Sequence, residues 1–226
     1  MNLTLFLSAV LVLSTGSQLE TSGEFLQAGR AYSEENDTAG ESRILCRYLE
    51  ESLYSGNSLH AFELIIQMES MPVYQQYFDF WYARLSWSCG LSRSAAAALD
   101  SVVGSPWLQH RAAGMAMQYR GDPGGAIDQY ILSLHGAETH RQKFYSALDL
   151  CFALVQAGRS IEAEEISRFL AERFPGEGLP LIALALSLHE QDRFGQSMSA
   201  LMSVGQSEQY SFICKEYARS LLEDLE

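Results

Sequence analysis

One layout recurs five times along the 226 residues, and this period restricts the possible folds more than any other feature of the sequence. Each copy has an apolar helix pattern, a turn residue, a small residue five positions later, and a second apolar helix pattern. The turn residues are Gly56, Gly90, Gly121, Gly158 and Asp192, and the small residues are Ala61, Ala95, Ala126, Ala163 and Ser197. Successive turns are separated by 34, 31, 37 and 34 residues. Such a period predicts stacked helix pairs in place of one globular core.

The physical chemistry of one unit explains the layout. A glycine, or less readily an aspartate, adopts the left-handed backbone conformation that closes a helix. The small residue then lies where two antiparallel helices approach too closely for a larger side chain. In the fourth copy, one helix face carries Leu148, Cys151, Phe152 and Val155, which follow the i, i+3, i+4 spacing. We therefore expect an all-α fold in which neighbouring pairs bury each other's apolar faces.

Two copies carry the most detailed motif. Residues 107–140 contain Gly114, Gly121, Ala126 and Tyr130, and residues 144–177 contain Gly158, Ala163 and Pro175. These residues at these spacings resemble the tetratricopeptide repeat (TPR) family. The first copy fits less closely, since Leu49 stands where a small residue is usual. A related helical hairpin repeat of the Sel1-like kind is the alternative, although its period agrees less well.

The resemblance implies a right-handed α-solenoid of about five antiparallel helix pairs, followed by a C-terminal capping helix. The implied pairs are 42–75, 76–106, 107–140, 144–177 and 178–211, and the capping helix is 212–226. We expect the second helices of the first, second and fourth pairs to stop at Pro72, Pro106 and Pro175. Residues 18–41 form an acidic lead-in, within which residues 25–32 have the pattern of one more helix.

The N-terminal segment 1–17 has the pattern of a secretory signal peptide. Residues 3–13 are almost continuously apolar but too few to span a bilayer, and small residues follow at Ser14, Gly16 and Ser17. No Lys or Arg precedes the apolar stretch, so a buried helix of the fold is the alternative. A signal peptide predicts an exported protein, periplasmic or extracellular, with no membrane span in its mature form. Without one, the protein would be cytoplasmic.

The charge of the chain argues against one class of partner. The sequence has 15 Lys and Arg against 28 Asp and Glu, a net charge of −13, and its only lysines are Lys143 and Lys215. Nucleic-acid binding needs clustered cations, so we expect no nucleic-acid partner. The acidic residues gather in the lead-in and at the C-terminus, where they favour solubility. Attraction of a basic partner is the alternative.

The side chains that usually carry catalysis or bind metals form no recognisable motif. The four cysteines, Cys46, Cys89, Cys151 and Cys214, are far apart in helical patterns and predict buried free thiols, with disulfides as the alternative. The five histidines show no metal-ligand spacing, and the glycine-rich stretch 121–125 lacks the Lys and Ser/Thr of a phosphate loop. We therefore predict no catalytic residue, no cofactor and no metal.

A binding surface is the remaining candidate site. In TPR proteins the first helix of each pair lines a concave face, where partners usually bind. The groove residues implied by the resemblance are Tyr77, Phe80, Arg84, Trp87, Arg111, Met115, Tyr119, Tyr145 and Phe152. The first four share one helix stripe, and aromatic and Arg side chains commonly carry binding energy at interfaces. The alternative is that these aromatics pack between helices.

Together these observations predict a non-catalytic scaffold or adaptor that binds a peptide or protein segment in an aromatic-lined concave groove. The chain resembles bacterial envelope TPR-like proteins, which implies a place in the cell envelope. TPR domains that grip chaperone C-termini use Lys, Arg and Asn, whereas the matching places here hold Glu50, Arg84, Met115, Phe152 and Leu186, so that function is not expected. Two alternatives are a regulatory or substrate-positioning subunit of an enzyme complex and a self-assembling homo-oligomer.

Overall fold

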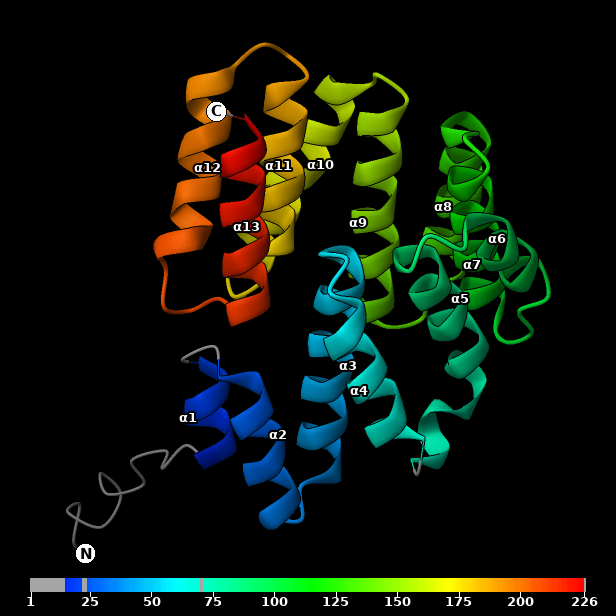
Figure 1. Cartoon of the computed structure of the whole chain (residues 1–226), viewed down its shortest axis with the longest axis vertical. Helices are drawn as coiled ribbons and strands as arrows, with labels where there is room; N and C mark the ends of the chain where they lie inside the picture. Colours follow the sequence, from blue (N-terminus) through cyan, green and yellow to red (C-terminus); the bar gives the residue numbers. More distant parts are fainter. Residues whose placement is uncertain (1–14, 22–23, 70, 226) are drawn as a thin grey trace, which may run out of the picture.

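The computed structural model describes residues 15–21, 24–69 and 71–225, and the elements within them are all helical. Five consecutive antiparallel pairs form the body of the molecule (Figure 1). They are α3 (Thr38–Tyr54) with α4 (Ser58–Met68), α5 (Phe78–Ser88) with α6 (Ser92–Asp100), α7 (Pro106–Tyr119) with α8 (Pro123–Gly136), α9 (His140–Gln156) with α10 (Ser160–Arg173), and α11 (Leu179–His189) with α12 (Phe194–Gln206). This architecture confirms the all-α solenoid and agrees with the TPR-like pattern of repeated helix pairs.

Four further elements complete the described chain. Helices α1 (Thr15–Thr21) and α2 (Phe25–Glu34) precede the pairs, a 3₁₀ helix, η2 (Pro72–Tyr77), links the first pair to the second, and α13 (Phe212–Leu225) follows the last pair. Helix α2 lies where the lead-in has a helical pattern, and it packs on α3. Helix α13 lies where the sequence implies a capping helix, and it packs on α12.

The turn residues behave as their chemistry predicts. The backbone φ angles of Gly56, Gly90, Gly121 and Gly158 are +72°, +82°, +80° and +72°. Asp192 takes the same place in the fifth pair with φ +58°. A Cβ atom at any of these four glycines would meet no heavy atom within 4 Å, so the left-handed backbone alone accounts for the glycine. The small residue five positions after each turn is fully buried, as the close approach of the two helices requires.

Two helix boundaries differ from the expectation. Helix α4 ends at Met68, and Pro72 is the first residue of η2. Helix α6 ends at Asp100, and Pro106 is the first residue of α7, where its missing N–H costs no hydrogen bond. Asn36 also has a positive φ, +58°, and forms the turn between α2 and α3. The sequence signal for this turn was weak because asparagine takes the place that glycine holds in the other pairs. Helix α3 therefore packs against α2 as well as α4.

The predicted signal peptide falls mostly outside the described residues, which begin at Thr15. Helix α1 includes Gly16 and Ser17 and packs on α2. The Tyr32 hydroxyl donates a hydrogen bond of 2.9 Å to Glu20, and Arg43 pairs with the same carboxylate at 2.6 Å. Within the described part of the chain, each helix is too short or too polar to cross a bilayer.

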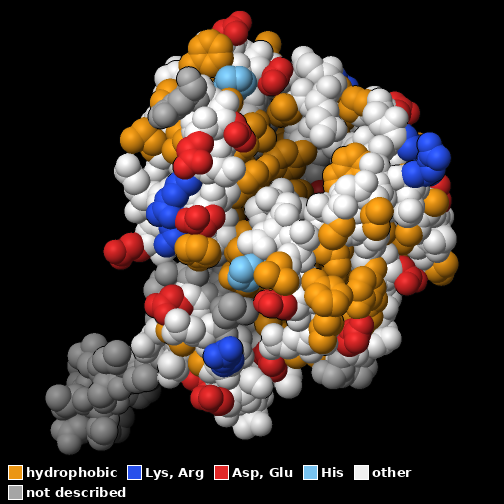
Figure 2. Space-filling view, in the orientation of Figure 1, with side chains coloured by type: hydrophobic (Ala, Val, Ile, Leu, Met, Phe, Trp, Pro, Cys, Tyr) orange, Lys and Arg blue, Asp and Glu red, His pale blue; other side chains and the backbone are white. Residues whose placement is uncertain are grey.

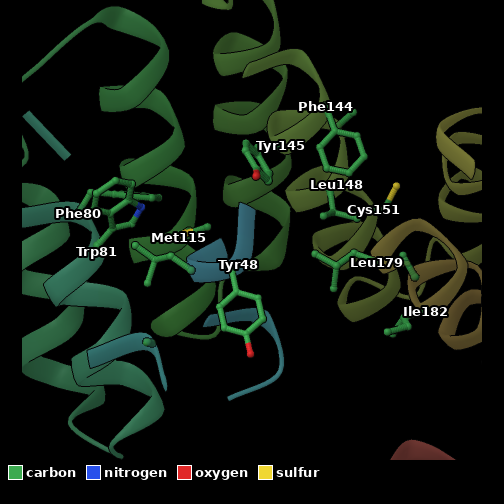
Figure 3. Packing of buried hydrophobic residues seen from close by; sticks show 14 of the residues in the cluster. Tyr48, Phe80, Trp81, Met115, Phe144, Tyr145, Leu148, Cys151, Leu179 and Ile182 are labelled. Atoms are coloured by element: carbon green, nitrogen blue, oxygen red, sulfur yellow. The ribbon is translucent and has the colours of Figure 1, made fainter. Parts of the chain in front are cut away.

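The solenoid curves round until its two ends meet at α3. Figure 1 shows α3 near the middle of the molecule, with α9 above it, α11–α13 to the upper left and α5–α8 to the right. Helix α3 contacts α5 directly and also contacts α13, which lies about 160 residues further along the chain. In a close view, Phe80, Trp81 and Met115 lie on one side of Tyr48 of α3 and Phe144 and Leu148 on the other, with Tyr145 above it (Figure 3). Helix α3 therefore fills the inside of the curve.

The cysteines are free thiols, as predicted, but they are not all buried. Cys151 and Cys214 lie in the core, and burial raises the pKa of the Cys151 thiol to about 12. Cys46 is half-buried, and Cys89 at the end of α5 is exposed. The prediction of a buried thiol was wrong for Cys89 because the helix ends there, where the apolar periodicity no longer implies a packed neighbour.

Candidate binding surfaces

The nine residues expected in the concave groove lie on α5, α7 and α9, with Tyr77 at the end of η2, and several of them contact one another across these helices. Their exposure does not match an open groove. Phe80, Arg84, Arg111, Met115 and Tyr145 are buried, and Tyr77, Tyr119 and Phe152 are partly buried. Only Trp87 is an exposed member of the set, at 39%. The inner face of the solenoid is thus covered by the chain itself, and the expectation that these side chains face a partner is not met.

Glu50 of α3 packs against this inner face. Its carboxylate accepts hydrogen bonds from Arg111 Nη1 at 3.1 Å and Arg111 Nη2 at 2.9 Å, a two-pronged contact between planar groups. Arg84 donates to the same carboxylate, and so does the Trp81 indole at 3.3 Å. Glu50 thereby joins α3 to α5 and to α7.

Arg111 carries the network on to α9. Its Nε atom donates to Asp149 Oδ2 at 2.6 Å, and the Tyr54 hydroxyl donates to the other oxygen of Asp149. The Arg111 guanidinium also lies 5.0 Å from the ring centroids of both Phe80 and Tyr145. Arg111 is 1% exposed, so its charge is balanced wholly by protein groups.

The pKa shifts of this cluster follow from its burial and pairing. Burial alone would raise the pKa of Glu50, but Arg111 and Arg84 lower it to about 2. Burial opposes the charge on Arg111 too, yet Asp149 and Glu50 hold its pKa well above the ordinary value. The pKa of Tyr54 is raised, first by burial and then by Asp149. The cluster is therefore a balanced set of two cations and two anions.

A second buried cluster joins α3 to the C-terminal part of the chain. Arg47 pairs with Glu51 at 3.2 Å and with Glu177 at 3.1 Å. Arg141 reaches Glu177 from α9 at 2.5 Å, and the Ser211 hydroxyl donates to Glu51. Because Glu177 and Ser211 lie beside the first residues of α11 and α13, these contacts close the curve of the solenoid.

Neither cluster has the arrangement of an acid–base or metal site. Each carboxylate is bound by arginine, which cannot release a proton at ordinary pH. In both clusters, the residues named above include no free nucleophile beside a base. Within the described residues, no group of three or more His, Cys, Asp and Glu side chains is placed to hold a metal ion. What the clusters do chemically is hold helices together.

An open concavity lies elsewhere, between α8 and α10 over the N-terminal half of α9. It has a volume of about 730 Å³ and a mostly apolar lining. Leu134 of α8, Phe144 of α9 and Ile166 and Phe169 of α10 line it, and Phe174 follows α10. We call this concavity the α8–α10 groove. Phe169 is 64% exposed, which is unusual for a phenylalanine with an apolar surface beside it.

The capping of α9 positions one end of this groove. The Thr139 hydroxyl accepts a hydrogen bond of 3.1 Å from the Gln142 backbone N–H, and the Gln142 side chain accepts one of 3.1 Å from the Thr139 backbone. This capping box fixes the first turn of α9, which carries His140 and Lys143. Both residues line the groove together with Arg173 and Glu165 of α10.

Sequence reasoning missed the α8–α10 groove because the helical spacing of apolar residues such as Ile166 and Phe169 is also what a packed helix face shows. Leu170 next to them is indeed buried, so α10 carries more apolar residues than its packed face can cover. This excess of apolar residues on α10 was a sequence feature that could have indicated the groove. A second such feature was Lys143, which is one of two lysines in the chain.

Hydrophobic side chains gather at further points of the surface. Figure 2 shows them around a hollow on the face presented, with acidic and basic side chains scattered around it.

Trp87 stacks on Tyr119 with ring centroids 3.9 Å apart and planes 5° from parallel. One face of the Trp87 ring is therefore packed against Tyr119, although Trp87 as a whole is exposed.

Comparisons with known proteins give a limited result. No protein-family model and no curated protein matches the sequence. Among solved structures, the chain is similar to a crystal structure of the P58(IPK) TPR domain, with 11% identity, over 92% of this chain and 77% of that chain. The TM-score is 0.27, at which a likeness carries no argument about fold or function. The solenoid of helix pairs rests on the geometry of this chain alone.

Proposed function

We propose that this protein is a non-catalytic interaction scaffold that holds an apolar segment of a partner protein in the α8–α10 groove. The observation that carries the proposal is an open apolar concavity of about 730 Å³ that holds the exposed Phe169. Apolar grooves of this kind between helices are where amphipathic or extended segments dock. Aromatic side chains such as Phe144, Phe169 and Phe174 supply the contact area that anchors a partner.

The buried charge clusters support a scaffold because they make the frame of the groove rigid. Asp149 of α9 is tied to α7 through Arg111, and Arg141 at the start of α9 is tied to Glu177. Helix α9 is the floor of the groove, so its position is held from both sides. A preformed groove reduces the ordering cost of binding, which favours affinity.

Selection from a displayed library of random peptides tests this proposal. We expect peptides selected on the wild-type protein to bind Phe169→Asp at least about tenfold more weakly. Phe62→Asp is the matched control, since Phe62 is an exposed phenylalanine of α4 outside the groove. Circular dichroism checks that both variants keep their helices.

The proposal fails if no selected peptide distinguishes Phe169→Asp from the control. A concentration-dependent mass in light scattering, lost in one of these variants, would indicate a self-assembling homo-oligomer in place of a scaffold for another protein.

We also propose that the protein is exported, on the strength of the apolar stretch 3–13 and the small residues after it. Mass spectrometry of the protein purified from its native source gives the N-terminal residue. A mature chain that begins near Gln18 supports export. An intact Met1 contradicts it.

A further inference from the structure

The α8–α10 groove differs from the rest of the surface in its charge. Most arginines of the described chain form ion pairs, for example Arg120 with Asp100 and Arg193 with Glu164. Lys143 and Arg173 take part in none of the ion pairs formed among the described residues. Both are exposed and line the groove. Arg30, Arg93 and Lys215 are also outside these ion pairs. What distinguishes Lys143 and Arg173 is that they line one apolar groove together, with Glu165 as its acidic residue, in a chain with net charge −13.

The antiparallel arrangement of α9 and α10 brings these cations to one end. His140 and Lys143 lie in the first turn of α9, and Arg173 is the last residue of α10. Glu165 lies eight residues before Arg173, about 12 Å along the axis of α10. The groove therefore has a cationic end, an apolar floor, and a carboxylate toward its other end.

We propose that the occupant of the α8–α10 groove is a peptide segment with apolar side chains and an acidic residue placed against Lys143 and Arg173. This inference rests on the proposed function, since it names the chemistry of the partner for the same groove. An Asp, Glu or C-terminal carboxylate pairs with these cations at the edge of an apolar contact, where the charges set specificity and the direction of the bound segment. The other end, at Glu165, then disfavours a second acidic residue.

The openness of the groove favours a peptide over a small amphiphile. Phe169 on its edge is more than half exposed, so a single acyl chain in the groove would leave much of its length in water. A peptide covers this edge with one face and keeps its other face solvated, as an amphipathic segment does.

The test extends the peptide selection with charge-reversed variants. Lys143→Glu/Arg173→Glu reverses the cationic end without touching the apolar floor. Arg30→Glu/Arg93→Glu is the control, since it makes the same change of net charge at two exposed arginines outside the groove. Affinities for the selected peptides are measured by fluorescence polarisation on both double variants, and the selection is repeated on the first.

We expect peptides selected on the wild-type protein to be rich in Asp and Glu next to their apolar residues. Their affinity should fall at least about tenfold in Lys143→Glu/Arg173→Glu and stay within about twofold in the control. Selection on the reversed variant should recover peptides with Lys or Arg at the matching position.

Three outcomes would overturn the inference. Neutral or basic peptides that bind equally well to the reversed variant but are lost in Phe169→Asp leave the proposed function standing and remove the acidic partner. The absence of any Phe169-dependent peptide removes both. Calorimetric binding of dodecanoate to the wild-type protein, lost in Phe169→Asp and combined with a failed selection, would assign the groove to a small amphiphile.

Discussion

At the scale of single residues, the buried charges are the least expected feature of this protein. Arg111, Glu50 and Asp149 are each at most 2% exposed. A buried ion network is weak evidence of net stabilisation, since desolvation opposes the Coulombic attraction. What the structure shows is connection: Glu50 and Tyr54 join α3 to α5, α7 and α9 through Arg84, Arg111 and Asp149.

Removal of one member should nevertheless be strongly destabilising. Arg111→Met leaves Glu50 and Asp149 buried without their shared partner, and we expect a loss of about 3–5 kcal/mol in the free energy of unfolding. Urea denaturation measures this loss. Arg120→Met is the control, because Arg120 and Asp100 form an exposed pair whose removal should cost far less. Equal losses in the two variants would show that the inner network is not buried in solution.

The lowered pKa of Glu50 predicts a pH dependence. Its folded-state pKa of about 2 lies below the ordinary value of 4.5, so its contribution is present above pH 4.5 and is lost as the pH falls toward 2. Glu51 acts in the opposite direction, since burial raises its pKa and its protonation on acidification favours the folded state. The stability change due to Glu51 therefore takes place above pH 4.5, outside the pH range in which Glu50 is protonated.

The measurement is the difference in unfolding free energy between wild type and Glu50→Gln, taken at several pH values. The difference should shrink between pH 4.5 and pH 2, because the wild-type carboxyl becomes neutral like the amide. A difference that stays constant across this range would contradict the paired state of Glu50.

At the scale of helices and turns, most of the structure was predictable from the sequence. Five turns with a positive φ, each followed by a fully buried small residue, are local chemistry that one chain segment specifies by itself. The Asn36 turn and the start of α7 at Pro106 were harder to predict because Asn and Pro each occur in more than one structural role.

The glycines of the turns and of the helices should respond differently to substitution. Gly158→Ala places a Cβ on a backbone with φ +72°, and we expect it to destabilise the fold by about 1 kcal/mol. Gly195→Ala in α12 should stabilise it by about 0.5–1 kcal/mol, since a Cβ there meets no atom within 4 Å and the helix gains propensity. Thermal denaturation of the pair checks the sign. Equal effects would contradict the assignment of Gly158 to a left-handed turn.

At the scale of the whole molecule, the sequence predicted the units but not how they close. The apolar period of each pair predicts that neighbouring pairs stack. It does not predict contacts between distant residues, such as the hydrogen bond between Arg47 and Gly176, which are 129 residues apart. Five of the residues expected in the groove, from Phe80 to Tyr145, are buried. Their burial could not be predicted, because it depends on the curvature that brings α3 inside.

That curvature is the central claim, since it removes the concave face as an open surface and leaves the α8–α10 groove exposed. Native-state hydrogen exchange of the α3 amides tests it most directly. If α3 lies inside the solenoid, amides 44–52 should exchange as slowly as those of α7 and α9, at a rate set by global unfolding. Exchange of α3 at the fast rate of an end helix, with α7 and α9 still protected, would contradict the closed solenoid.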